Sequence, residues 1–241
     1  MDNPGREARE KMTNYLYFDY EADQSGTFYL LGQRYRGHTA QWVLDRALDV
    51  AADAKGLAVG EVGWVTEELL ELALRSSAVL VAYSTAEANY LKTLFEGEIP
   101  ERYQGLPYLN MAKAAKHWVR RNHAERFVAL GDYASLQHRG QPAYVRNQIN
   151  HSLASRMRLT DFPPPGNYGI RRVMAKLNYV ISALMRHKQN FEKISRGAKK
   201  KWTEALIHNC YDVEAMEVLH DVIHHEDKKC LDWATKTLGE M

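Results

Sequence analysis

The sequence predicts a layered fold of the α/β or α+β class, in which helices flank a mixed β-sheet. Segments 15–21 and 27–35 are rich in aromatic residues and place odd and even members on opposite faces, which is typical of strands, and 38–44 adds a third candidate. A continuous apolar run at 78–82 predicts a buried strand, and it follows a helical period at 61–76. The resulting order, β-β-β-α-β-α and then further helices, predicts the fold class.

Length and composition favour one globular domain. The chain has 241 residues, of which 45% are apolar and 26% are charged, and no stretch approaches the roughly 18 apolar residues of a membrane span. Residues 1–14 carry charges but lack the apolar centre of a signal peptide. We therefore expect a disordered arm over 1–14, a single domain over 15–241, a cytoplasmic location and no contact with a membrane.

The first two strands are expected to form a β-hairpin, because the turn signal Asp23-Gln24-Ser25-Gly26 separates them. Val65, Leu69 and Leu72 recur among acidic residues and predict the amphipathic helix at 61–76. After the buried strand, Ser84 or Thr85 is a suitable cap for a helix that runs to about residue 95.

The second half of the chain is mainly helical in pattern, with helices predicted at 109–122, 167–177 and 201–225. Between the first two of these, segment 124–165 has scattered glycines and ends in three consecutive prolines. It shows no usable period, so we interpret it as a partly helical insertion or a long connection.

Asp19 and Glu21 lie two residues apart in the first strand, so their carboxylates project from one face. Two like charges at this spacing repel each other unless a cation joins them, and hard oxygen ligands suit Mg²⁺ or Mn²⁺. The alternative is a pair of solvated carboxylates at an exposed strand end. The pair predicts a metal site only together with other acidic residues.

Two further segments supply such residues. Glu87 is predicted in the first turn of the helix after the buried strand, at the carboxyl end of the sheet, where α/β folds place their ligands; a role in complementing the helix dipole is the alternative. His208 and Asp212 lie four residues apart and share one helical face. An imidazole beside a metal-bound carboxylate suits a general base for an attacking water, and an ordinary surface pair is the alternative.

Taken together, the three segments resemble the DEDD superfamily of 3′ to 5′ exonucleases, whose fold is ribonuclease H-like. The first family motif, a hydrophobic strand ending in Asp-x-Glu, is matched by Leu16-Tyr17-Phe18-Asp19-Tyr20-Glu21. The second motif normally has Asp followed four residues later by Leu, and here Glu87 is followed by Leu91.

The third motif resembles the branch with the pattern Tyr-Asn-x-x-Asp-x-x-Ala, which reads His208-Asn209-x-x-Asp212-x-x-Ala215 in this chain. In the histidine branch of the family, the imidazole lies five residues before the Asp. This chain therefore combines the residue of one branch with the spacing of the other. The resemblance covers 15–32, 79–94 and 167–219.

The resemblance implies a ribonuclease H-like nuclease that hydrolyses phosphodiester bonds of DNA or RNA from a 3′ end with two Mg²⁺ or Mn²⁺ ions. In this scheme Asp19 bridges both ions, Glu21 and Asp212 complete the site that activates water, Glu87 supports the second ion, and His208 takes the proton. The alternative is an inactive domain of the same fold that binds nucleic acid or a protein partner.

Basic residues gather in one stretch although the net charge is only +2. Between Arg171 and Lys201, Glu192 is the only acidic residue that opposes them. The candidates for phosphate contacts are Arg171, Arg172, Lys176, Lys199, Lys200 and Lys201, with Tyr83 and Tyr90 as candidates for stacking on a terminal base. A solvated helix face is the alternative. A smaller basic group ends an earlier helix: Arg120, Arg121, His123 and Arg126.

A transition-metal site at the end of the long helix is a further alternative. His220 and His224 have i, i+4 spacing, and His225, Glu226 and Asp227 follow, but the chain has no HExxH motif. Histidines at a helix end are also simply favoured by the helix dipole. The sequence has no GxxxxGK[ST], GxGxxG or GxSxG signature, so neither ATP use nor acyl transfer is expected.

Overall fold

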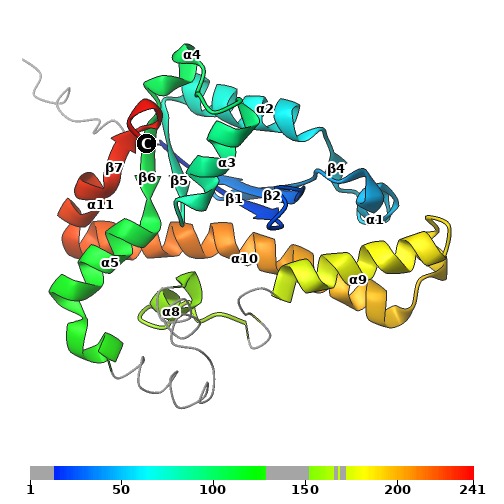
Figure 1. Cartoon of the computed structure of the whole chain (residues 1–241). Coiled ribbons are helices and arrows are strands. Elements are labelled where there is room, and N and C mark those ends of the chain that lie inside the picture. Colours follow the sequence, from blue (N-terminus) through cyan, green and yellow to red (C-terminus); the bar gives the residue numbers. More distant parts are fainter. Residues whose placement is uncertain (1–13, 129–151, 166–167, 169–171) are drawn as a thin grey trace, which may run out of the picture.

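Figure 1 shows the computed structural model, in which helices pack against a β-sheet. The described residues are 14–128, 152–165, 168 and 172–241. Within them, seven strands form one sheet in the order β4-β3-β2-β1-β5-β6-β7. The strands are β1 (Asn14–Ala22), β2 (Phe28–Tyr35), β3 (His38–Val43), β4 (Ala58–Val59), β5 (Ala78–Ala82), β6 (Pro107–Asn110) and β7 (Thr235–Thr237).

The sheet is mixed. β2 runs antiparallel to both β1 and β3, as the predicted hairpin requires, whereas β1, β5 and β6 run parallel to one another. At the two edges, β4 is parallel to β3 and β7 is antiparallel to β6. The predicted α/β class is confirmed, and the arrangement is consistent with a ribonuclease H-like fold.

Helices cover both faces of the sheet. Figure 1 shows α2, α3 and α4 on one side, and the long α10 with α5, α8 and α9 on the other. The helices are α1 (Asp49–Asp53), α2 (Val62–Ser76), α3 (Ala86–Leu94), α4 (Glu101–Gln104), α5 (Met111–Asn122), α8 (Leu153–Met157), α9 (Arg172–Arg186), α10 (Arg196–Asp227) and α11 (Lys229–Ala234).

β1 is buried on both faces because its side chains alternate between two cores. Leu16, Phe18 and Tyr20 join the core beneath α2 and α3, whereas Tyr17 joins the core formed with α5, α10 and α11. Asp19 continues the Tyr17 face. The sequence alternation therefore directs the acidic residues of β1 toward α10.

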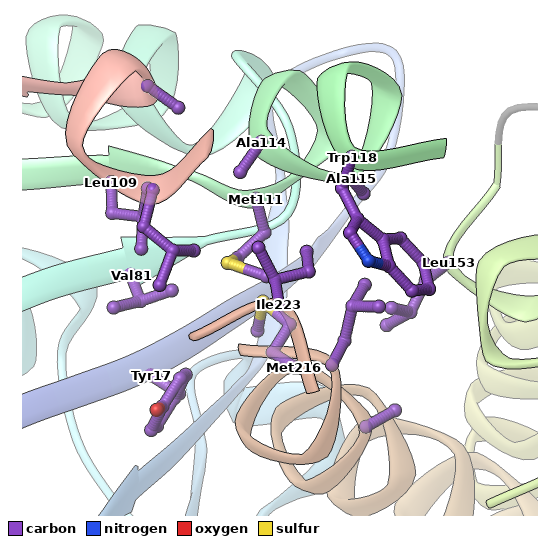
Figure 2. Close-up of a cluster of buried hydrophobic side chains, with 14 of the residues drawn as sticks. Tyr17, Val81, Leu109, Met111, Ala114, Ala115, Trp118, Leu153, Met216 and Ile223 are labelled. Atoms are coloured by element: carbon purple, nitrogen blue, oxygen red, sulfur yellow. The ribbon is translucent and has the colours of Figure 1, made fainter. Parts of the chain in front are cut away.

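The core beneath α10 also fixes α5 against that helix. In Figure 2, Trp118 of α5 and Leu153 of α8 lie beside side chains of α10, among them Met216 and Ile223. Trp118 is fully buried and donates a hydrogen bond from Nε1 to Glu226 Oε2 at 2.8 Å. α5 and α10 are thus held in one packed layer.

Most elements agree with the sequence prediction, with differences at their ends. Asn14 is predicted to end the disordered arm, but it is the first residue of β1 and pairs with Ala78; residues 1–13 lie outside the described residues. Residues 109–110 belong to β6 rather than to the predicted helix, because the Asn110 side chain accepts a hydrogen bond from Lys113 N at 2.9 Å and caps α5.

The long helix predicted over 201–225 is confirmed as α10, which has 32 residues. It starts earlier than predicted because Ser195 is its N-cap and accepts a hydrogen bond from Ala198 N at 3.1 Å. The helix predicted over 167–177 overlaps α9, which continues to Arg186; Tyr168 lies outside the helix. Segment 124–165 contains α8, and its residues 129–151 lie outside the described part. No helix among the described residues combines the length and the apolar character needed to cross a membrane.

Candidate metal-binding and catalytic site

The carboxylates of β1 meet a histidine and an aspartate of α10. His208 Nε2 lies 3.3 Å from Asp212 Oδ2 and 4.0 Å from Glu21 Oε1. Ligand atoms of these three residues all lie within 4.8 Å of one another, and each side chain is at most 13% exposed. The i, i+4 spacing predicted for His208 and Asp212 therefore brings both to the same point as Glu21.

Glu87 joins this group from the opposite helix layer. It lies in the first turn of α3 and is 6% exposed. Ser84, just after β5, donates hydrogen bonds to Glu87 Oε2 from its backbone N at 3.1 Å and from Oγ at 2.7 Å. The charge of Glu87 raises the pKa of Asp19, Glu21 and Asp212, so all four carboxylates share one electrostatic environment.

Burial of these like charges raises the pKa of each carboxyl group. Burial is the largest cause for Asp19, followed by the charges of Asp212, Glu21 and Glu87. Burial and the same repulsion raise the pKa of Glu21, and burial raises that of Glu87 against its hydrogen bonds from Ser84. The pKa of Asp212 is raised to about 7, chiefly by burial. A cation at this position would remove the repulsion.

His208 carries no charge at neutral pH. Burial lowers its pKa to about 4, and the nearby positive charge of Lys176 acts in the same direction. A neutral imidazole has one nitrogen free to accept a proton or a metal ion. Its position beside Glu21 and Asp212 allows either role.

A chain of amide hydrogen bonds orients Asp19. The Leu206 carbonyl on α10 can only accept, so Gln41 turns its Nε2 toward it at 3.0 Å, and the same group donates to Asn209 Oδ1 at 2.9 Å. Asn209 must therefore present Nδ2 to β1, where it donates to the Asp19 backbone O and Oδ2, both at 3.3 Å. This bond lowers the pKa of Asp19 and opposes the effect of burial.

Gly32 makes room for this chain of hydrogen bonds. It pairs with Asp19 on one side and with Gln41 on the other, so the three residues form one row across β1, β2 and β3. A Cβ atom at Gly32 would lie 2.6 Å from Asn209 Oδ1, which is closer than real contacts allow. The close approach of α10 to the sheet at Asn209, which is fully buried, requires glycine at this position.

Tyr168 completes the site. Its hydroxyl donates a hydrogen bond to Asp212 Oδ1, and its ring stacks on the His208 imidazole with centroids 4.2 Å apart and an interplanar angle of 15°. Both Asp212 oxygens thus face a polar partner. The sequence prediction missed Tyr168 because it placed this residue in the helix predicted over 167–177, whereas Tyr168 lies outside α9. It missed Gln41 because the strand pairing that brings Gln41 to Asn209 is not visible in sequence. Asn209 is part of the quoted motif, but its role was not predicted.

The predicted phosphate contacts lie mostly along α9 and the start of α10. Lys176 is 12% exposed and forms an ion pair with Glu204 at 3.2 Å; Lys200 approaches the same glutamate at 3.9 Å. Lys199 pairs with Glu192 at 3.1 Å, and Lys201 lies over the Tyr179 ring at 5.1 Å. Arg172 is in α9, and nothing is described of its side chain; Arg171 lies outside the described residues.

The two tyrosines predicted to stack on a base are both partly buried. Tyr90 makes edge-to-face contacts with Tyr20 and Phe28, with centroids 6.4 and 5.2 Å apart. Tyr83 interacts with the buried Arg156 and packs against the core beneath α10. Their rings therefore contribute to packing.

The alternative metal site at the end of α10 does not assemble. His220 is 3% exposed, its Nδ1 lies 3.1 Å from Asp221 Oδ1, and its ring lies 4.0 Å from that of Tyr15. His224 approaches it only through ring stacking at 5.9 Å. Within the described ranges, three ligand atoms converge at Glu21, His208 and Asp212, and not around His220.

Comparison with protein-family models, with curated proteins and with solved structures found no match.

Proposed function

We propose that this protein is a metal-dependent nuclease that hydrolyses phosphodiester bonds of DNA or RNA from a 3′ end. One observation supports the proposal most directly: Asp19, Glu21, Glu87 and Asp212, from three separate parts of the chain, share a poorly hydrated site with the neutral His208. Such a concentration of like charge is costly to folding. Active sites are where folds commonly retain arrangements of this kind.

The donor set fits Mg²⁺ or Mn²⁺. All four acidic side chains offer hard oxygen atoms; burial raises the pKa of each, and repulsion by neighbouring carboxylates raises it further for Asp19, Glu21 and Asp212. Asp19, Glu21, Glu87 and Asp212 would hold two ions. When bound, the ions would supply stabilisation of the attacking and leaving oxygens of an in-line displacement.

The protein's own groups would then position and deprotonate the attacking water. His208 is neutral, so its free ring nitrogen can take the proton of that water. Tyr168 fixes both partners, since its ring stacks on His208 and its hydroxyl binds Asp212. Asn209 holds the Asp19 carboxylate in place. Basic residues of α9 and α10 would bind the phosphate backbone of the substrate. We expect the protein to act in the cytoplasm.

The first test is digestion of single-stranded DNA and RNA, labelled at the 3′ or the 5′ end, with Mg²⁺ or Mn²⁺. We expect stepwise shortening from the 3′ end, and Asp19→Asn or Asp212→Asn should nearly abolish it because each removes a metal ligand. His208→Gln should lower the rate on the order of 10² to 10⁴. Asp53→Asn, at an exposed carboxylate at the end of α1, is the matched control and should retain full activity.

The melting temperature with Mn²⁺, measured beside this digestion, separates the proposal from the alternative of an inactive domain that only binds nucleic acid or a protein partner. If Mn²⁺ raises the melting temperature of the natural protein but not of Asp19→Asn, and no DNA or RNA is cut, the acidic group is a metal site without nuclease activity. If Mn²⁺ does not raise the melting temperature and no DNA or RNA is cut, the proposal of a metal site is itself wrong.

A further inference from the structure

α5 separates its residues into a buried face and a basic face. Met111, Ala114, Ala115, Trp118 and Val119 are buried against the core. The other side of the helix carries Lys113, Lys116, His117, Arg120 and Arg121, which follow one another at helical spacings of three and four residues. The helix contains no acidic residue, so nothing on α5 itself neutralises this face.

An exposed aromatic side chain lies directly against the basic face. Trp233 of α11 is 60% exposed, and its ring stacks on that of His117 with centroids 4.9 Å apart and an interplanar angle of 19°. α11 is anchored by the buried Cys230, Leu231 and Ala234, so the indole is held on a packed support. A large apolar ring is costly to leave in water, which makes this position informative.

Acidic residues of α10 and α11 are already engaged by other partners. Asp227 binds Arg121 at 2.7 Å, Glu226 accepts from Trp118 and lies 2.9 Å from His123, and Asp232 binds Lys228 at 2.7 Å. Across the described part of the chain, no carboxylate lies within 4.0 Å of the cationic groups of Lys113, Lys116, Arg120 or Lys229. We call Lys113, Lys116, His117, Arg120, Lys229 and Trp233 the α5–α11 surface.

This surface begins beside the acidic site. β6 is parallel to β5, and Asn110 at its end pairs with Ala82, so α5 starts at the sheet edge where Ser84 and Glu87 follow β5. The two segments are joined by a hydrogen bond from Ala112 N to Tyr83 O at 2.8 Å. A chain bound along α5 would therefore lead toward Glu87.

We propose that the α5–α11 surface binds single-stranded nucleic acid, with one base stacked on Trp233 and the phosphates along Lys113, Lys116 and Arg120. Positive charge that tracks a backbone, together with an exposed aromatic ring, is the combination that binds single strands with little sequence preference. The inference extends the proposed nuclease function, because it takes the proposed substrate class as the ligand.

The test measures binding without hydrolysis, by fluorescence anisotropy of labelled oligothymidylate in EDTA, at several salt concentrations. A second oligonucleotide of the same length carries abasic sites and offers phosphates without bases. The variants are Trp233→Ala and the double variant Lys116→Glu with Arg120→Glu. The control is Lys55→Glu with Arg75→Glu, which makes the same charge change at two exposed positions, one in the turn after α1 and one on α2. Circular dichroism confirms that each variant is folded.

We expect Trp233→Ala to weaken binding of oligothymidylate about tenfold and to leave the abasic oligonucleotide nearly unaffected, because only a base can stack. The double variant should weaken both ligands and reduce the slope of log affinity against log salt by about 1.4, since each lost phosphate contact removes about 0.7. The control should bind as the natural protein does.

Three results would overturn the inference: unchanged affinities in both variants, as a surface for a protein partner would give; an equal loss in the control; or an equal loss of abasic binding in Trp233→Ala. Because no metal is present, these outcomes are independent of hydrolysis. If oligonucleotides bind at this surface but are not cleaved in Mg²⁺, only the proposed nuclease function is contradicted. If the Trp233→Ala and double variants cleave and bind with unchanged affinity, only the proposed binding surface is contradicted.

Discussion

The backbone carbonyl oxygen of Leu206 determines the orientation of the Asn209 side-chain amide. Leu206 O accepts from Gln41, Gln41 then donates to Asn209 Oδ1, and the Nδ2 of Asn209 is left to face Asp19. Reversing either amide would place two acceptors or two donors together. The network therefore presents a donor to Asp19 and favours its charged form, which is the form a metal ion needs.

Gly32→Ala should disturb this network directly. The new Cβ would meet Asn209 Oδ1 at 2.6 Å, and forcing an atom into such a packed contact costs about 1–3 kcal/mol. We expect a lower free energy of unfolding in urea and weaker Mn²⁺ binding by calorimetry. Gly105→Ala is the control, because a Cβ there has no atom within 4 Å. Equal stability of the two variants would show that α10 does not approach the sheet as described.

For single residues, the sequence predicts those members of the site that lie close together in one strand or one helix. Asp19 and Glu21 follow from the strand period, and His208 and Asp212 follow from the helix period. Gln41 and Asn209 meet only because β1, β2 and β3 pair in one register and α10 crosses them at Gly32. That contact joins residues 168 positions apart, and no local pattern encodes it.

Among the elements, α5 depends most on a single side chain. Asn110 is 4% exposed and its Oδ1 accepts from Lys113 N at 2.9 Å, which satisfies one of the free N–H groups of the first turn. The sequence predicts this helix but not β6 in front of it, because a strand of four residues is too short to show a period. The cap marks the boundary between the two.

Asn110→Ala should destabilise the protein by about 1 kcal/mol, because it removes the cap and leaves the Lys113 N–H group without its partner in the protein. Thr85→Ala is the matched control: Thr85 is the N-cap of α3 but makes no capping hydrogen bond with its side chain. Thermal unfolding of both variants measures the difference. A loss for Thr85→Ala as large as that for Asn110→Ala would contradict the capping explanation.

For the molecule as a whole, the acidic site links folding to pH. The folded pKa of Asp212 is about 7, above its ordinary value of 3.8, so folding favours the protonated form. The stability that the protonated Asp212 contributes is complete below about pH 4 and is lost as the pH rises through 7. His208, whose folded pKa is about 4, acts in the opposite direction, since its neutral form favours folding at high pH.

Asp212→Asn isolates the carboxylate contribution, because the amide resembles the protonated acid. Without metal, we expect the variant to gain melting temperature over the natural protein as the pH rises from 4 to 7, with a constant difference above that range. With saturating Mn²⁺ the natural protein should have the higher melting temperature, since metal binding stabilises only the protein that retains the Asp212 carboxylate. Differential scanning calorimetry across this range is the measurement. A difference that does not vary with pH would contradict a raised pKa for Asp212.

The single helix α10 also restricts how this protein can change in length during evolution. A one-residue insertion in a helix rotates the residues on one side of it by about 100° relative to those on the other side. An insertion between Ser195 and His208 would therefore turn either the basic residues at the start of α10 or His208 and the residues after it away from their present neighbours. An addition of about seven residues, close to two turns, would restore the phase. Natural insertions and deletions are therefore expected to accumulate in the connections between elements and to spare α10.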